Sequence, residues 1–175
     1  MNWSEWSIAR ALAVQTLKSK CIVLVDNCSW TGHECDVLGV TTDLRIIDIE
    51  IKISRPDLKA DAKKLKWWSA KNTHPPKVWK HYYALPKEIW KPELLECLPS
   101  PASGVLLLEK SWTQFREIEI TCARRAVPDR NAHRLTPLEV IALARLANIR
   151  MWQSRNSSNA LIKHLPSEDT EGGEI

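Results

Sequence analysis

The stretch Arg45-Ile-Ile-Asp-Ile-Glu-Ile-Lys-Ile-Ser54 decides the fold of this chain. Four of its isoleucines, at 47, 49, 51 and 53, alternate with four polar residues, Asp48, Glu50, Lys52 and Ser54. Because successive side chains of a strand point to opposite faces, the alternation predicts a β-strand with one apolar and one polar face. The preceding run Glu34-Cys-Asp-Val-Leu-Gly-Val40 predicts a second strand that also carries acids. The sequence therefore places carboxylates on two neighbouring strands.

Further elements can be assigned on both sides of this stretch from apolar spacing, capping residues and turn residues. The expected elements are a helix at 4–18, strands at 21–25, 34–40 and 45–53, a helix at 56–70, a strand at 78–85, a hairpin of strands at 104–109 and 117–123, and a helix at 136–153. The first three strands are joined by short polar turns, which predicts an antiparallel meander. The order of elements indicates an α/β fold.

Length and composition favour one domain. The chain has 175 residues, 44% of them hydrophobic, which is enough for one full core. We expect a single domain at 1–155, followed by a polar, acidic tail at 156–175 that is partly disordered. No run approaches the roughly 20 apolar residues of a membrane helix, and the N-terminus lacks the pattern of a secretory signal. A soluble cytoplasmic protein without membrane contact is expected.

Five cysteines, an odd number without a C-x-x-C pair, argue against a disulfide framework and a zinc ribbon. Reduced and mostly buried thiols are the expected state. Cys28, His33 and Cys35 lie close enough in sequence to suggest zinc, but their spacing fits no usual ligand pattern. The zinc interpretation is therefore the weaker alternative.

Positive charge is concentrated in one part of the chain. The net charge is +4, yet residues 52–91 hold eleven Lys and Arg against three Asp and Glu. Basic residues with interleaved aromatics suit nucleic acid, through phosphate neutralisation and base stacking. The aromatics concerned are equally consistent with a buried core; they are Trp67, Trp68, Trp79, Tyr82, Tyr83 and Trp90. The expected nucleic-acid-binding residues are Arg55, Lys59, Lys63, Lys64 and Lys66.

The acids and one lysine suit phosphodiester hydrolysis. Such a reaction needs charge neutralisation and a nucleophile made from water, and Mg²⁺ held by hard oxygen ligands supplies both. Asp36 and Glu50, on neighbouring strands, are the expected metal ligands. Lys52 lies two residues beyond Glu50 on the same face, where its ammonium can reach the phosphate or the attacking water.

Other residues near this trio have open roles. Glu34 and Asp48 could add an outer ligand or be solvated, and Ser54 could donate a hydrogen bond to phosphate. Glu5, in the first turn of its helix, either faces the site or serves the helix dipole. The alternative for the whole constellation is cross-strand ion pairing on a solvated face, where a Glu-x-Lys pattern is common.

The run Glu34–Val40, followed by Ile49-Glu-Ile-Lys-Ile-Ser-Arg-Pro-Asp-Leu-Lys-Ala-Asp61, resembles the PD-(D/E)XK nuclease superfamily, and within it the MmcB-like DNA-repair nucleases. The resemblance covers roughly residues 30–153 and is loose outside the motif. Cys35 replaces the proline that gives the superfamily its name, and Leu65 replaces a tryptophan expected in the basic helix. The second departure bears more on the subgroup than on the superfamily.

The resemblance implies a fold, a cofactor and residue roles. It implies a mixed central β-sheet flanked by helices, restriction-endonuclease-like with an α-β-β-β-α-β core, to which the predicted hairpin and C-terminal helix are additions. It implies Mg²⁺ or Mn²⁺, with Asp36, Glu50 and Lys52 as the catalytic trio. The backbone carbonyl of Ile51 is implied as a further metal ligand, and Glu5 as an acid of the first helix.

Three functions follow as hypotheses. The first is a Mg²⁺-dependent DNA endonuclease that acts in DNA repair, recombination or foreign-DNA processing. The second is a catalytically inactive nucleic-acid-binding or interaction protein on the same scaffold, and the third, weaker one is hydrolysis of RNA. A homodimer is an open alternative to a monomer, because a small nuclease often uses a second subunit to cut both strands.

Overall fold

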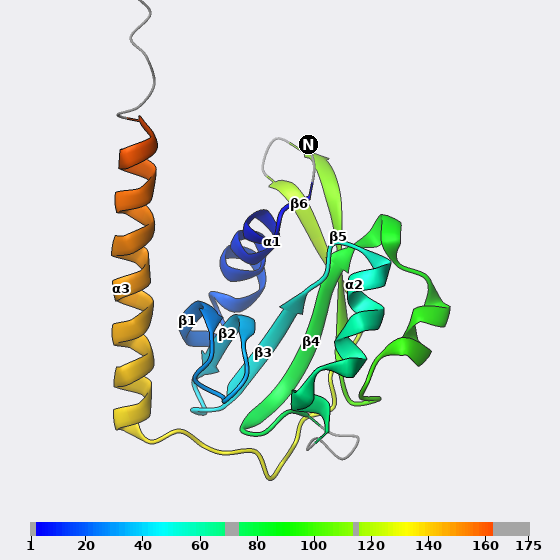
Figure 1. Cartoon of the computed structure of the whole chain (residues 1–175), viewed down its shortest axis with the longest axis horizontal. Coiled ribbons are helices and arrows are strands. Elements are labelled where there is room, and N and C mark those ends of the chain that lie inside the picture. The colour runs from blue at the N-terminus through cyan, green and yellow to red at the C-terminus, as the bar shows by residue number, and fades with distance from the viewer. Residues whose placement is uncertain (1–2, 69–73, 114–115, 163–175) are drawn as a thin grey trace, which may run out of the picture.

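The decisive stretch forms β3 (Ile46–Ile51), the third strand of a six-stranded sheet with the order β1-β2-β3-β4-β5-β6. This is seen in a computed structural model that describes residues 3–68, 74–113 and 116–162 (Figure 1). The other strands are β1 (Cys21–Cys28), β2 (Cys35–Thr41), β4 (Val78–Pro86), β5 (Gly104–Thr113) and β6 (Arg116–Arg124). The helices are α1 (Glu5–Ala11), continued by a π-helix at Leu12–Leu17, α2 (Arg55–Ala60) and α3 (Pro137–Ile162). Short 3-10 helices occur at Asp61–Lys63, Leu65–Trp67, Lys87–Ile89 and Pro92–Cys97.

The sheet is mixed. β1, β2 and β3 form the predicted antiparallel meander, β4 runs parallel to β3, and β5 runs parallel to β4. β5 and β6 are the predicted antiparallel hairpin. The α/β class, the α-β-β-β-α-β order, the added hairpin and the C-terminal helix are thus confirmed. Among the described residues, no helix is long and apolar enough to cross a bilayer.

One face of the sheet is covered by the N-terminal helices. Ile8 and Leu12 pack there against a cluster of buried side chains from β2 and β3, namely Val37, Ile47, Ile49 and Ile51. The capping box at Ser4 starts this helix, as the sequence predicts. The isoleucine face of β3 therefore lies in the core.

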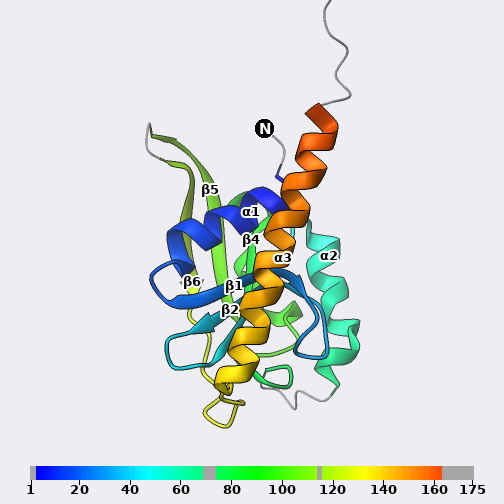
Figure 2. The same ribbon diagram turned by 90° about the vertical axis from the view of Figure 1, so that its left-hand side faces the viewer.

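The opposite face carries two apolar clusters. Leu143 of α3 packs with Leu38 and Ile46 over the first strands, and Figure 2 shows α3 crossing in front of β1 and β2. Leu58 of α2 packs with Tyr83 and its neighbours over β4 and β5. Asp48 and Glu50 of β3 share this face with Leu38, Ile46 and Tyr83, because Asp48 pairs with Leu38 and Glu50 with Tyr83. A polar seam therefore runs along β3 between the two clusters.

One alternative and one prediction about this face are wrong. The polar face of β3, which the ion-pairing alternative places in solvent, is buried, since Asp48 is 0% and Glu50 1% exposed. The helix expected at 56–70 ends at Ala60, and the chain continues as two 3-10 helices separated by an extended Lys64 (ψ 140°). This break lets the segment fold down over β3. The C-terminal helix α3 is longer than expected, because it includes residues 156–162 of the predicted tail. The rest of that tail, residues 163–175, lies outside the described residues.

Candidate functional site

The centre of the polar seam is Glu50, which is surrounded by lysines. Its Oε2 lies 3.2 Å from Lys52 Nζ and 3.1 Å from Lys64 Nζ, and its Oε1 accepts a hydrogen bond from Lys66. Burial by itself raises the pKa of Glu50, but the charge of Lys66 and its hydrogen bond outweigh this, and the pKa is lowered. Glu50 is therefore ionised and paired at neutral pH.

Asp61, at the end of α2, is a second buried acid of this network. Its Oδ2 accepts hydrogen bonds from Tyr83 Oη (2.6 Å) and Trp67 Nε1 (3.0 Å), and its Oδ1 lies 3.2 Å from Lys52 Nζ and 2.9 Å from Lys64 Nζ. Burial by itself raises the pKa of Asp61. The lysines and the Tyr83 hydrogen bond outweigh burial, so that the pKa lies well below the ordinary value. Lys52 thus bridges Glu50 and Asp61. Sequence reasoning did not assign Asp61; the only local signal is its i,i+3 spacing to Lys64.

Lys52 keeps its charge in this setting. Burial lowers the pKa of its ammonium, but Asp61 and Glu50 together outweigh burial, and the pKa is raised. The predicted pair of Glu50 and Lys52 is thus brought together in contact. A lysine with a raised pKa is a cationic donor and not a general base.

Asp36 lies beside this network and not within it. Its Oδ2 accepts a 2.6 Å hydrogen bond from the backbone N–H of Ile51. Burial, and next the negative charge of Glu50, raise its pKa from 3.8 to about 6. Asp36 therefore lies on the strand next to that of Glu50, close enough for the charge of Glu50 to raise its pKa.

Mg²⁺, which the family resemblance implies, suits these carboxylates to different degrees. Asp36 fits, because it is a half-buried carboxylate with one backbone hydrogen bond and the negative charge of Glu50 nearby, which a cation would offset. Glu50 fits after one exchange, since both of its oxygens contact ammonium groups. Lys64, whose side chain is 48% exposed, has a path to solvent, and its departure would open Oε2 to a cation.

The remaining predicted residues occupy varied positions. Glu5 is exposed in the first turn of α1, and Glu34 is exposed before β2. Ser54 caps α2 by accepting from the N–H of Asp57, so its hydroxyl has a structural partner. The side chain of Ile51 lies in the core.

The five predicted nucleic-acid-binding residues divide into two groups. Lys59 and Lys63 are exposed. Lys66 is buried against Glu50, Lys64 is shared between Glu50 and Asp61, and Arg55 donates a 2.7 Å hydrogen bond to the carbonyl of Ile89. The basic segment therefore neutralises the protein's own acids with part of its charge.

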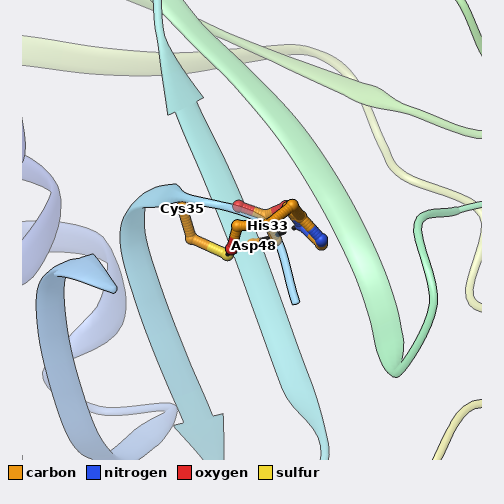
Figure 3. A group of neighbouring side chains, drawn as sticks. All are labelled: His33, Cys35 and Asp48. Atoms are coloured by element: carbon orange, nitrogen blue, oxygen red, sulfur yellow. Dashed lines mark hydrogen bonds and ion pairs between the residues drawn. The ribbon is translucent and has the colours of Figure 1, made fainter. Parts of the chain in front are cut away.

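A second group of ligand-type side chains lies at the other end of the seam. His33, Cys35 and Asp48 have ligand atoms that all lie within 4.8 Å of one another (Figure 3). His33 and Cys35 belong to the trio weighed for zinc from the sequence. Cys28 packs with Cys35 in the apolar cluster under α3 but is outside this ligand group. Spacing along the chain could not reveal the third member, because Asp48 comes from a different strand.

Comparisons with known proteins give the fold alone. No family model matches the chain, and no curated protein matches it. Among solved structures, a protein of unknown function from Silicibacter pomeroyi is similar, with 20% sequence identity and a TM-score of 0.58. The similarity covers 100% of this chain and 99% of that chain. At this identity the likeness extends to the α/β architecture over the whole length.

Proposed function

We propose that this protein is a Mg²⁺-dependent DNA endonuclease, which hydrolyses phosphodiester bonds in DNA repair, recombination or foreign-DNA processing. The observation that carries the proposal is the placement of Asp36 on β2 next to the contacting pair Glu50 and Lys52 on β3. The resemblance of the same residues to the PD-(D/E)XK motif supports it. Mn²⁺ is the alternative cofactor.

In this proposal each side chain has a separate task. Asp36 and Glu50 would hold the cation, for which Lys64 would have to release Glu50. When bound, the cation supplies a Lewis acid for the phosphoryl oxygens. Lys52 stays protonated, held between Glu50 and Asp61, and places a positive donor where charge develops on the phosphate.

Exposed lysines provide the surface for the DNA backbone. Lys59 and Lys63 follow the site directly along the chain and face solvent. Phosphate contacts of this kind position a duplex without reading its sequence. DNA is accordingly the proposed partner, without sequence specificity from these residues.

One observation favours a second candidate, a nucleic-acid-binding protein without catalysis. Both oxygens of Glu50 contact ammonium groups, and the two buried acids Glu50 and Asp61 contact three lysines, Lys52, Lys64 and Lys66. These two carboxylates are thus neutralised without a metal ion. Buried charges paired in this way are stable structural features as well as catalytic ones.

Plasmid cleavage distinguishes the two candidates. Supercoiled plasmid is incubated with the full chain and Mg²⁺ or Mn²⁺, and nicked and linear products are measured for wild type, Lys52→Ala and Lys91→Ala. Lys91 is an exposed lysine outside the site and serves as the matched control. The endonuclease proposal expects Lys52→Ala to cut at least about 100-fold more slowly, with Lys91→Ala unchanged.

Two outcomes would overturn the endonuclease proposal. The first is cleavage by Lys52→Ala at the wild-type rate. The second is DNA binding in EDTA with no product under any divalent ion, which supports the non-catalytic candidate. Because Lys52 is buried, Glu50→Gln is tested in parallel, and circular dichroism checks the fold of both variants.

A further inference from the structure

The group formed by His33, Cys35 and Asp48 has the spacing of a metal site. His33 Nε2 lies 3.1 Å from Asp48 Oδ2 and 3.6 Å from Cys35 Sγ. In a tetrahedral zinc site, bond lengths near 2.0 Å to N and O and 2.3 Å to S put neighbouring N and O ligands about 3.3 Å apart, and N and S ligands about 3.5 Å apart. Both measured distances are close to these edges.

Local backbone geometry brings the three side chains together. Asn27 has a positive φ of 43°, and beyond this irregularity Cys28 and Cys35 both join the cluster on the α3 face. Gly32, with φ of 98°, turns the chain so that His33 lies over β3. Asp48 rises from the middle of β3 on the same side (Figure 3).

Thr31 holds the imidazole of His33. Its Oγ1 donates to the carbonyl of His33 at 2.9 Å and lies 3.2 Å from His33 Nδ1. In a metal-bound His33, Nδ1 would carry the ring proton and donate it to this hydroxyl, which also lies 3.4 Å from Nε2. Metal-bound histidines usually have such a partner on the second ring nitrogen.

We propose that His33 Nε2, Cys35 Sγ and an oxygen of Asp48 bind one Zn²⁺ ion or a similar borderline transition metal. The site is separate from the Asp36 and Glu50 carboxylates, and the proposal does not depend on nuclease activity. A thiolate and an imidazole select zinc, copper or cobalt over Mg²⁺, which takes oxygen ligands.

Unpaired buried atoms around Asp48 support the proposal independently. Within the described part of the chain, Asp48 Oδ1 and His81 Nε2 have no hydrogen-bond partner, although both residues are 0% exposed. His81 Nε2 lies 3.9 Å from Asp48 Oδ2, too far for a hydrogen bond. Buried polar groups without partners are rare in native proteins, and an ion is one recognised reason for them.

Metal binding to this group would replace the proton of the Cys35 thiol. Burial, and next the charge of Asp48, raise the pKa of the Cys35 thiol, so the metal-free side chain is protonated. Binding releases that proton to solvent as the Cys35–metal bond forms.

One member of the group borders solvent. His33 lines a cavity of about 500 Å³, together with Thr31, Gly32, Glu34, Lys64, Leu65, Lys66 and Pro76. Cys35 and Asp48 do not line this cavity and are 0% exposed, so His33 is the side from which an ion in solvent would reach the group.

Cobalt substitution tests the site. Metal-free full-length protein is titrated with Co²⁺, and the thiolate-to-cobalt charge-transfer band is recorded. One equivalent is expected to give the band in wild type and in Cys28→Ala, the matched control that removes a buried neighbouring thiol outside the ligand group. Cys35→Ala is expected to lose the band.

A second variant keeps the proposal falsifiable if Cys35→Ala does not fold. His33→Ala changes a residue in the turn before β2, and it is expected to weaken Zn²⁺ binding by on the order of 100-fold, as measured by chelator competition. The proposal is overturned if wild type shows no charge-transfer band at one equivalent, if the band persists in Cys35→Ala, or if His33→Ala binds Zn²⁺ as tightly as wild type.

Discussion

At the scale of single residues, the polar seam is governed by the cost of burying charge. An ionised carboxylate moved away from water costs several kcal/mol unless it is paired and hydrogen-bonded. Glu50 and Asp61 meet this requirement through lysines, and Asp48 meets it in part through His33. Asp36 does so least, with a single backbone hydrogen bond and a negative neighbour.

The raised pKa of Asp36 predicts a pH dependence of stability. Its pKa is near 3.8 when unfolded and about 6 when folded, so the native state binds more protons between these values. Its contribution to the free energy of unfolding therefore falls as pH rises from 4 to 6 and stays low above that. Asp36→Asn keeps an acceptor for Ile51 N–H without the charge, and at pH 7.5 we expect it to be more stable by about 1–2 kcal/mol.

Urea unfolding of wild type and Asp36→Asn from pH 4 to 8 measures this difference. Comparing the two proteins at each pH removes the contributions of other titrating groups. The exposed Asp43→Asn is the control and is expected to change stability by less than about 0.5 kcal/mol. A difference between wild type and Asp36→Asn that does not grow between pH 4 and 7 would contradict the prediction.

At the scale of elements, the strands could be predicted and the segment after β3 could not. The two-residue period at 45–53 and the capping box at 136–139 are local signals. They predicted the position of β3 and the first residue of α3 closely. The helix expected at 56–70 ends at Ala60, because the following segment places Lys64 and Lys66 against Glu50 of β3 and Asp61 against Lys52. Tertiary ion pairing outweighed helix propensity there, and one sequence carries no local signal for it.

Two lysines of this segment test the interpretation. Lys66 has a 2% exposed side chain against Glu50, whereas Lys63, three residues earlier, is exposed. Lys66→Ala leaves a buried carboxylate with fewer partners and is expected to destabilise the protein by about 3 kcal/mol. Lys63→Ala is expected to cost less than about 0.5 kcal/mol. Urea unfolding at pH 7.5 compares them, and equal stability of the two variants would show that the Lys66 contact is not formed.

At the scale of the whole molecule, the sequence predicts the architecture better than the site. Chain order and strand count came from alternation and turns, and the topology brought Glu50 and Lys52 together as expected. Asp61 was missed as part of the site, and the meeting of His33 and Cys35 with Asp48 was not foreseen. These contacts join residues from separate elements, so only the packed sheet defines them.

The uneven charge of the molecule leads to a prediction about DNA binding. We expect duplex affinity to fall with salt, because lysines that contact phosphates release counterions. Replacing Lys59 and Lys63 together by alanine should reduce the slope of log affinity against log salt by about 2, uniformly across sequences. Fluorescence polarisation at several salt concentrations measures the slope, with Lys91→Ala as control. An unchanged slope in the double variant would show that DNA does not contact Lys59 and Lys63.

The parallel pairing of β3 with β4 also determines how this part of the molecule unfolds locally. Residues 52–77 must cross over before β4 can pair, and this crossover holds Lys52, Asp61, Lys64 and Lys66. If this crossover detached, the acids of β3 would lose their lysine partners, and the pairing of β3 with β4 would weaken at the same time. Amides along β3 and β4 should thus exchange their hydrogens as one cooperative unit, which frees the carboxylates and the strand together.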